Sequence, residues 1–211
     1  MALDVNSVHI VEKETPMTDK KTAIIEATIS AVAKYGLSKT NAQLVAEEMN
    51  IAQSSIFYYF PQQQQLFNSL NEYITKHNSE QVKQLVEDVQ ASNSFERLCR
   101  FIKGNLLWAV NNRDHVTVLL YSLAESRQSP TISKEVSSIL KSAEDKVYFY
   151  LVTGIAEGEF TVKSNIRSLA RFINQSVNGT VITHFHLQED WDIDSYMDDL
   201  TSYLKELIHL R

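Results

Sequence analysis

The sequence predicts an all-α protein, with an N-terminal three-helix head joined by a long helix to a helical C-terminal body. Its 211 residues include only 5 Gly and 3 Pro, too few for the tight turns of a sandwich, a barrel or a doubly wound sheet. Hydrophobic residues make up 44% and charged residues 22%, which is typical of a folded globular chain. Apolar residues recur at the three- and four-residue spacing of helices.

Composition also limits the location and the partners. The net charge of −6 means that nucleic acid would have to bind to a local surface. Cys99 is the only cysteine, which excludes an intrachain disulfide and a CxxC site and favours a reducing, cytoplasmic location. No apolar run approaches the roughly 18–20 residues of a membrane span, so we expect no membrane partner. Residues 1–16 lack a basic-then-apolar signal pattern and are predicted to be a flexible leader.

The head begins with an amphipathic helix. Ile25, Ile29 and Val32 lie on one face of it, and Gly36 is expected to end it because glycine readily takes a positive φ. Thr40 is the expected N-cap of a second, short helix.

A third short helix is expected over residues 53–60. Asn50 precedes it and tolerates the left-handed conformation of a tight turn. Pro61 ends the third helix and can open a fourth, which would run to about residue 90.

The body is expected to consist of further helices. They are predicted over residues 94–111, 114–127, 130–157, 165–188 and 193–210. The predicted organisation is a leader at residues 1–16, a helix-turn-helix domain at 17–65 and a helical ligand-binding and dimerisation domain at 66–211.

The two short helices and their turn form a helix-turn-helix pattern. The second of these helices must be held rigidly and exposed on one side if it is to enter a major groove about 12 Å wide. The expected inner packing residues are Val45, Ile51, Ile56 and Phe60. The outward residues can hydrogen-bond to base edges and phosphates, and they are Gln53, Ser54, Ser55, Tyr58 and Tyr59.

The run AIIEATISAVAKYGLSKTNAQLVAEEMNIAQSSIFYYFPQQQQLF resembles, without gaps, the DNA-binding head of the TetR family of transcriptional regulators. The matching positions are Ala27, Gly36, Leu37, Thr40, Val45, Ala46, Ile51, Ile56, Tyr59 and Phe60. The resemblance implies a ligand-responsive repressor that binds a near-palindromic double-stranded DNA operator as a homodimer. The expected DNA contacts are Lys39, Thr40, Asn41, Gln43, Gln53, Ser54, Ser55, Tyr58, Tyr59 and Gln63.

The head departs from the family pattern in ways that leave a second interpretation open. Positions where the family often has basic residues hold Gln43 and Gln63. Four lysines and four acidic residues cancel between residues 17 and 65. The alternative function is therefore a helical ligand- or protein-binding module whose helix-turn-helix scaffold has lost DNA binding.

A small, largely apolar effector is the expected ligand of the body. Ligands in helical bundles usually bind between the helices. The candidate pocket residues are Trp108, Tyr121, Phe149, Phe172 and His184. Aromatic residues at helical spacing are also typical of plain core packing, so both interpretations stay open.

The resemblance places the dimer interface on the last two long helices, whose apolar faces could pair as a four-helix bundle. The candidate interface residues are Leu169, Ile173, Val177, Val181, Tyr196, Leu200 and Leu204.

The sequence contains no Gly-rich phosphate loop, HExxH or GxSxG motif. We therefore expect no enzyme activity, no cofactor and no metal site. His115, beside a helix start, is expected at the surface.

Overall fold

The computed structural model describes residues 17–87, 93–187 and 191–210, so the expected leader at residues 1–16 lies outside the described residues. The elements are α1 (Met17–Tyr35), the 3-10 turn η1 (Leu37–Lys39), α2 (Ala42–Glu48), α3 (Gln53–Tyr59), α4 (Gln63–Glu87), α5 (Ser94–Asn111), α6 (Arg113–Glu125), α7 (Pro130–Ala156), β1 (Phe160–Val162), α8 (Ile166–Leu187), α9 (Ile193–Leu207) and β2 (Ile208–Leu210). The predicted all-α class, with a helix-turn-helix head and a helical body, is confirmed.

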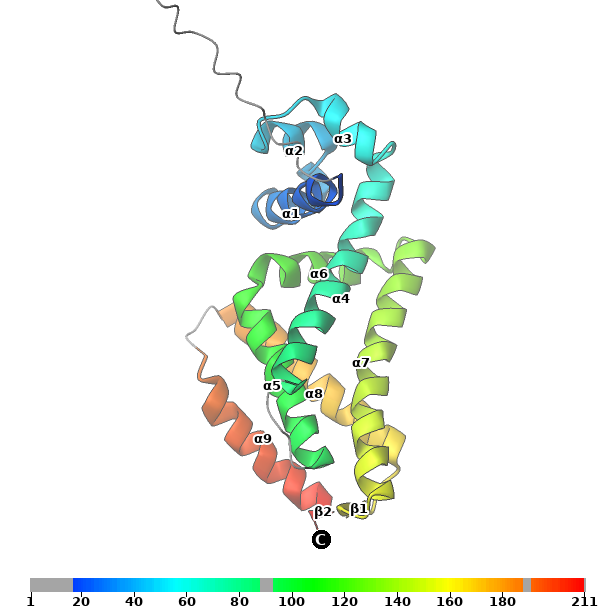
Figure 1. The fold of residues 1–211 in the computed structure, drawn as a ribbon, viewed down its shortest axis with the longest axis vertical. Coiled ribbons are helices and arrows are strands. Elements are labelled where there is room, and N and C mark those ends of the chain that lie inside the picture. Colours follow the sequence, from blue (N-terminus) through cyan, green and yellow to red (C-terminus); the bar gives the residue numbers. More distant parts are fainter. Residues whose placement is uncertain (1–16, 88–92, 188–190, 211) are drawn as a thin grey trace, which may run out of the picture.

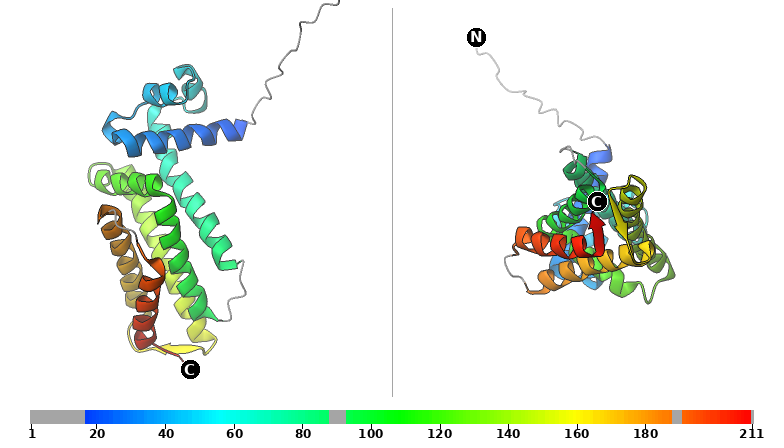
Figure 2. Two further views of the ribbon diagram at one scale, coloured as in Figure 1. Left: turned by 90° about the vertical axis from the view of Figure 1, so that its left-hand side faces the viewer. Right: turned by 90° about the horizontal axis from the view of Figure 1, so that it is seen from below.

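The head and the body are stacked along the long axis of the molecule (Figure 1). Helices α1, α2 and α3 form the head, and α4 descends from the head into the body (Figures 1 and 2). Helix α6 lies crosswise beneath α1 and packs against it. One short body helix therefore supports the head from below.

The helices of the head end and begin near the residues predicted from the sequence. Gly36 has φ 85° at the end of α1 and Asn50 has φ 53° in the turn between α2 and α3. Both values lie in the left-handed region that glycine and asparagine tolerate. Helix α4 begins two residues after Pro61.

Two hydrophobic cores run through the molecule. The first contains Ile29 and Val45 of the head and continues through Leu70 of α4 to Trp108 and Val116 of the body. The second joins α5, α7, α8 and α9 with both strands. The first core crosses the predicted domain boundary after residue 65, so the head and the upper body share packing, and that boundary stays a prediction.

The C-terminal end of the described chain departs from expectation. A helix was predicted through residue 210, but α9 ends at Leu207 and the next three residues form β2. Strand β2 pairs antiparallel with β1, placing Val162 opposite Ile208. Phe160 and Ile208 are buried, so each strand contributes one apolar side chain to the second core. The pairing joins segments far apart in the sequence.

No helix within the described ranges combines the length and the apolar character needed to cross a bilayer.

Candidate functional site

The first candidate site is the outer face of α2 and α3. Helix α2 is capped by Asn41, whose side chain accepts a hydrogen bond from the Leu44 backbone N–H at 2.9 Å. Thr40 was the expected cap, but its side chain is turned inward. It is 3% exposed and its hydroxyl donates to the Gly36 carbonyl at 2.9 Å. The predicted DNA contact by Thr40 is therefore corrected, because its side chain fastens α2 to the end of α1.

Helix α3 is fixed from beneath and open above. Ile56 and Phe60 are buried, as predicted for the inner face. Tyr58 is 73% exposed, Gln53 and Ser54 are exposed, and Ser55 and Tyr59 are half-buried. The Tyr58 and Tyr59 rings pack edge to face with their centroids 5.0 Å apart. This packing limits the rotamers available to both side chains.

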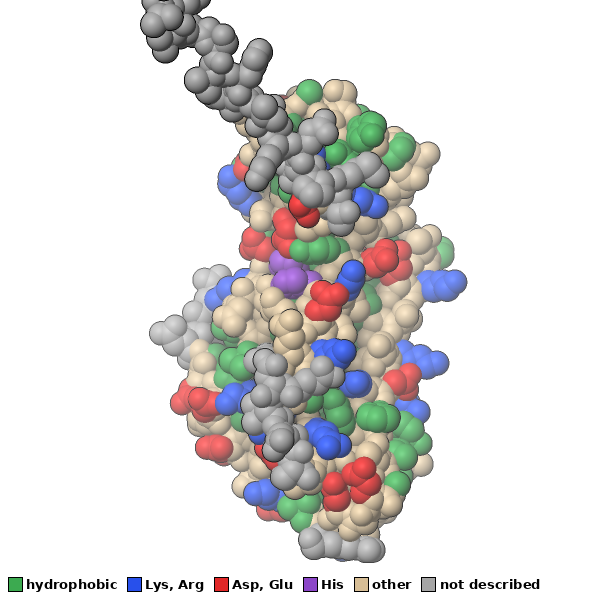
Figure 3. Space-filling model, in the orientation of Figure 1, with side chains coloured by type: hydrophobic (Ala, Val, Ile, Leu, Met, Phe, Trp, Pro, Cys, Tyr) green, Lys and Arg blue, Asp and Glu red, His purple; other side chains and the backbone are tan. Residues whose placement is uncertain are grey.

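Ile51 was predicted to pack inward, and this prediction is wrong. Its side chain is 38% exposed because it borders the open hollow between α1 and α3 and is not enclosed in the core. Phe57 is exposed as well. Hydrophobic side chains, drawn green, accordingly lie on the head surface in Figure 3. The face combines neutral hydrogen-bonding groups with apolar groups.

The remaining predicted DNA contacts lie around this face. Lys39, Asn41, Gln43 and Gln63 are exposed. Gln43 donates to Glu47 at 2.9 Å. The Gln63 side-chain oxygen accepts from the Ala42 backbone N–H at 3.4 Å, which ties the start of α4 to the start of α2.

Part of the negative charge of the head is neutralised internally. The Glu48 carboxylate accepts a hydrogen bond from the Tyr35 hydroxyl at 2.5 Å and lies 3.4 Å from the Lys34 ammonium. These two hydrogen bonds, that of Tyr35 first, lower the pKa of the Glu48 carboxyl. Lys20 lies beside Tyr58 in the hollow between α1 and α3, and Lys39 is exposed. Few cations therefore lie near the outer face of α2 and α3.

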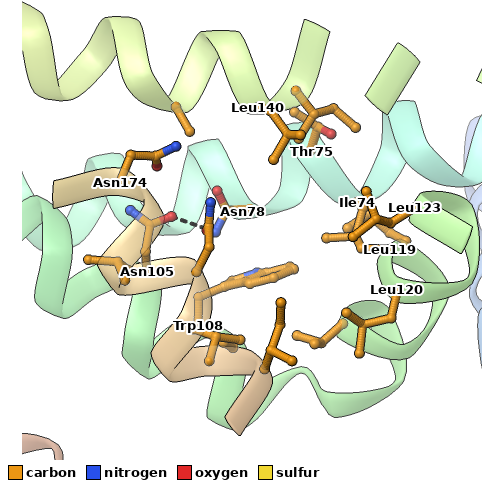
Figure 4. Close-up of a pocket in the computed structure, with 18 of the residues that line it drawn as sticks. Ile74, Thr75, Asn78, Asn105, Trp108, Leu119, Leu120, Leu123, Leu140 and Asn174 are labelled. Carbon is orange, nitrogen blue, oxygen red and sulfur yellow. Dashed lines mark hydrogen bonds between the residues drawn. The ribbon is translucent and has the colours of Figure 1, made fainter. Parts of the chain in front are cut away.

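The second candidate site is a cavity of about 280 Å³ in the body. It lies among α4, α5, α6, α7 and α8, and most of its walls are apolar. Figure 4 shows its two ends, with the indole of Trp108 between them. The labelled side chains of the apolar end are Ile74, Leu119, Leu120, Leu123 and Leu140.

The opposite end carries side-chain amides. The Asn78 amide donates to the Asn105 side-chain oxygen at 3.3 Å, and the Asn105 amide donates to the Phe101 carbonyl at 2.8 Å. Asn174 and Asn178 follow one another by one turn of α8 and also line the cavity. None of the described residues that line it carries a charge.

Of the five aromatic and histidine residues predicted to line a pocket, Trp108 alone lies in this cavity wall. The other four are corrected. The Tyr121 hydroxyl lies beside Gly36 under the head. Phe149 and Phe172 are exposed, and His184 stacks on Trp191 at 4.2 Å. The sequence pattern favoured aromatic residues and missed the four asparagines, whose shared place in one wall depends on how the three helices α4, α5 and α8 pack.

A polar cluster joins the cavity to the head. The Trp108 indole N–H donates to Nδ1 of His77 at 3.2 Å, and the His77 ring stacks on His115 at 5.1 Å. Nε2 of His115 lies 3.7 Å from a carboxylate oxygen of Glu26 in α1. The same carboxylate accepts a short hydrogen bond from Tyr73. We call these five residues the junction cluster.

His115 was expected at the surface, but it is 8% exposed because α6 lies beneath α1. Burial lowers its pKa, a trend that the charge of Glu26 opposes, so the imidazole is neutral near pH 7. Tyr73 is affected in the opposite direction, because burial and its hydrogen bond to Glu26 raise the pKa of the phenol. Figure 3 shows histidine side chains, in purple, between the head and the body.

The predicted dimer residues divide into two groups. Leu169, Ile173, Val177 and Leu204 are buried in the second core, and Val181, Tyr196 and Leu200 are half-buried against the cores. The first four are corrected, because they pack within their own chain and are closed to a partner. The exposed apolar residues of the same helices are Phe172, Ile182, Tyr203 and Leu207.

Within the described parts of the chain, no group of three or more His, Cys, Asp or Glu side chains is placed to hold a metal ion.

Comparison with known proteins supports the assignment of the head. Residues 24–70 match the family described as "Bacterial regulatory proteins, tetR family". The fatty acid metabolism regulator protein of Bacillus subtilis is 20% identical over 187 residues, which cover 88% of this chain and 94% of that protein.

Solved structures show the same fold. A TetR transcription regulator from Haloarcula marismortui superposes with a TM-score of 0.79 at 17% identity, over 91% of this chain and 100% of that one. The regulator FadR from Bacillus subtilis, in complex with stearoyl-CoA, has a TM-score of 0.72 at 19% identity, over 89% and 99% of the two chains. The matched family and these relatives are transcriptional regulators, which are not enzymes.

Proposed function

We propose that this chain, a regulator of the TetR family, is a cytoplasmic repressor that acts as a homodimer. The dimer binds a near-palindromic operator. It releases the operator when a small, largely apolar effector enters the body cavity. The observation that carries the proposal is the position of α6. Val116 and Leu120 of this helix line the cavity, while His115 and Tyr121 of the same helix lie against the head.

The exposed face of α3 is suited to direct reading of base edges. Gln53 and Ser54 offer hydrogen-bonding groups, and Gln can bond an adenine through two atoms in the major groove. Phe57 and Ile51 are exposed apolar groups that can contact thymine methyls. Lys20 and Lys39 supply the phosphate contacts that position the helix.

The exposed apolar residues of α8 and α9 form the proposed dimer face. Phe172 is 59% exposed and Tyr203 is 64% exposed, and both belong to the helices that the family resemblance assigns to dimerisation. Gly179 lies between Phe172 and Ile182 on α8, and an added Cβ there would meet nothing within 4 Å. Two copies can bring these helices together as a four-helix bundle.

The junction cluster is the proposed route from effector to DNA. An effector that displaces the Trp108 indole changes its hydrogen bond to His77 and the stacking of His77 on His115. Because His115 lies beside Glu26 of α1, the displacement also moves α1. Movement of α1 in both subunits alters the separation of the two α3 helices. A shift from almost all DNA-competent to almost all released needs an effector that prefers the released state by about 5.5 kcal/mol.

The alternative is a helical module that no longer binds DNA. It is favoured by the paucity of free lysines on the head, because Lys34 is paired with Glu48. Such a module would keep the cavity and its ligand but would recognise no duplex.

A gel-shift assay distinguishes the two functions. We expect the full chain to shift a fragment of the DNA upstream of its own coding sequence at low salt, and Tyr58→Ala and Gln53→Ala to lose the shift. Lys163→Ala, an exposed change near β1, serves as the matched control and is expected to bind normally. If the parent protein shifts no fragment while circular dichroism shows that it is folded, the repressor function is wrong and the ligand-binding module stands.

A further inference from the structure

We propose that the body cavity selects an uncharged amphiphile, a molecule with a neutral hydrogen-bonding head and an apolar tail. This inference rests on the proposed function, since it names the chemical class of the effector of the same cavity. Three features carry it: the absence of charge in the wall, the separation of polar and apolar ends, and the unused hydrogen-bonding capacity of the amides.

The first feature is that no described residue of the wall carries a charge. Of the 22 described residues in the wall, five are polar, and these are four asparagines and Thr75. An ionic head group that enters such a cavity loses its hydration and gains no counter-charge, which costs several kcal/mol in a protein interior. A carboxylate or a quaternary ammonium group is therefore disfavoured by this wall.

The second feature is the arrangement of the polar and apolar groups. Figure 4 shows Asn78, Asn105 and Asn174 close together at one end, and Leu119, Leu123 and Leu140 at the other. Thr75 lies beside Leu140, but its hydroxyl donates to the Asn71 carbonyl at 2.7 Å. The three amides come from α4, α5 and α8, so they converge from different helices. A ligand that fits both ends places its head among the amides and its tail among the leucines, with its middle against Trp108.

The third feature is that some of the asparagine side chains have hydrogen-bonding groups that no described residue uses. The Asn105 amide is committed to the Phe101 carbonyl and to Asn78. The side chains of Asn174 and Asn178 make no hydrogen bond with any described residue, although both face the cavity. An asparagine amide offers two donors and an acceptor. A head that itself donates and accepts, such as a primary amide or an alcohol, matches this set.

The class is tested with a matched eight-carbon series on the full chain in the absence of DNA. Isothermal titration calorimetry compares octanamide, 1-octanol, octanoate and octyltrimethylammonium at pH 7.5. We expect octanamide and 1-octanol to bind, and the two ions to bind about 100-fold more weakly or worse, which corresponds to the cost of an unpaired buried charge. Octanoyl-CoA, which carries a neutral thioester on a charged carrier, is titrated as a fifth ligand. We expect it to bind more weakly than octanamide.

Variants of the amide end sharpen the test. Asn174→Leu removes one amide and should weaken octanamide about 10-fold, the usual cost of a lost hydrogen bond. Asn174→Asp keeps the shape and adds a negative charge, so it should improve binding of octyltrimethylammonium relative to octanamide. Gln84→Leu, at an exposed amide of α4 outside the cavity, should bind the series as the parent protein does.

Several results would overturn the inference. They are binding of either ion within tenfold of octanamide, tighter binding of octanoyl-CoA than of octanamide, unchanged octanamide affinity in Asn174→Leu, and no binding of any member at 1 mM. Release of DNA is measured separately. If octanamide binds with the expected preference but leaves the operator complex intact, the ligand class stands and the proposed regulatory function fails.

Discussion

The indole N–H of Trp108 donates to Nδ1 of His77 at 3.2 Å, so one residue belongs both to the cavity wall and to the junction cluster. His77 accepts at Nδ1, and the side-chain amide of Gln81 lies 3.2 Å from its other ring nitrogen. Both ring nitrogens of His77 therefore have fixed neighbours. Any ligand that moves the indole must disturb this arrangement, because a hydrogen bond at this distance tolerates little displacement.

Replacing Trp108 with Phe should separate ligand binding from its effect on DNA. The aromatic ring remains in the wall, but the N–H that contacts His77 is lost. We expect effector affinity within about threefold of the parent, and a loss of about 0.5–2 kcal/mol in the coupling between effector and operator. Operator affinity measured with and without effector gives this coupling. Trp191→Phe, which removes the other indole outside the cavity, is the control, and an equal loss in both variants would refute the assigned route.

The buried imidazole of His115 should make stability depend on pH. Burial lowers its pKa from the ordinary value of 6.5, against the opposing charges of Glu26 and Asp114 and with the support of nearby His77. The unfolded chain therefore binds a proton at a higher pH than the folded chain does. Stability contributed by the neutral imidazole is complete well above pH 6.5 and is lost as the pH falls below that value towards the lowered folded pKa.

Urea denaturation between pH 5 and pH 8 checks this dependence. We expect the urea concentration at the midpoint of unfolding to decrease for the parent protein as the pH is lowered. The decrease should be smaller in His115→Gln. His209→Gln changes an exposed histidine of β2 and should leave the pH profile unaltered. Parallel profiles for the parent and His115→Gln would show that His115 does not contribute to the dependence.

Gly154 is a packing requirement of the second core. A Cβ at this position would lie 2.2 Å from a ring carbon of Phe160, whose side chain is buried. Gly154→Ala should destabilise the protein by about 1–3 kcal/mol, which lowers the melting temperature by about 2–4 °C for each kcal/mol. Gly179→Ala, where an added Cβ meets nothing within 4 Å, should instead be neutral or gain up to about 1 kcal/mol. Thermal unfolding of both variants tests the pair, and equal melting temperatures would contradict it.

Operator binding should depend weakly on salt. Two lysines per head, Lys20 and Lys39, are the proposed phosphate contacts, which gives about four per dimer. The logarithm of the binding constant should therefore fall against the logarithm of the salt concentration with a slope of about −4 or shallower. Titrations between 50 and 200 mM salt measure it. A slope of about −7 or steeper, equivalent to eight phosphates, would contradict the assigned contacts.

The proposed dimer face should be sensitive to charge. Tyr203→Asp places a carboxylate on the exposed side of α9, within the proposed dimer face, and should shift the chain towards monomers in light scattering or sedimentation. Phe149→Asp alters a comparably exposed aromatic residue of α7 and should leave the association state unchanged. Dimers of undiminished stability in Tyr203→Asp would exclude this face.

The helices could be predicted because their boundaries are local properties. Gly36, Asn50 and Pro61 mark the head segments through backbone conformations that few other residues favour. The pairing of β1 with β2 could not be predicted in this way, because Val162 meets Ile208 only after the body helices have packed.

The candidate sites were predictable to a smaller extent. The apolar stripe of α8 was identified, but periodicity cannot tell which apolar residues face the core and which face a partner. Ile173 is thus buried while Phe172, its neighbour, is exposed. The same limit explains why Asn174 was missed, since an isolated polar residue on a helix carries no sequence signal for a cavity that helices from distant segments enclose.

Selection from a pool of random DNA duplexes tests the central claim most directly, because the pool contains every short operator sequence and none has to be chosen beforehand. The exposed face of α3 is expected to make the parent protein enrich one near-palindromic sequence at low salt. Tyr58→Ala and Gln53→Ala should relax that preference while remaining folded. Enrichment of no sequence by the folded parent protein, or the same sequence enriched by both variants, would contradict the claim that α3 reads DNA.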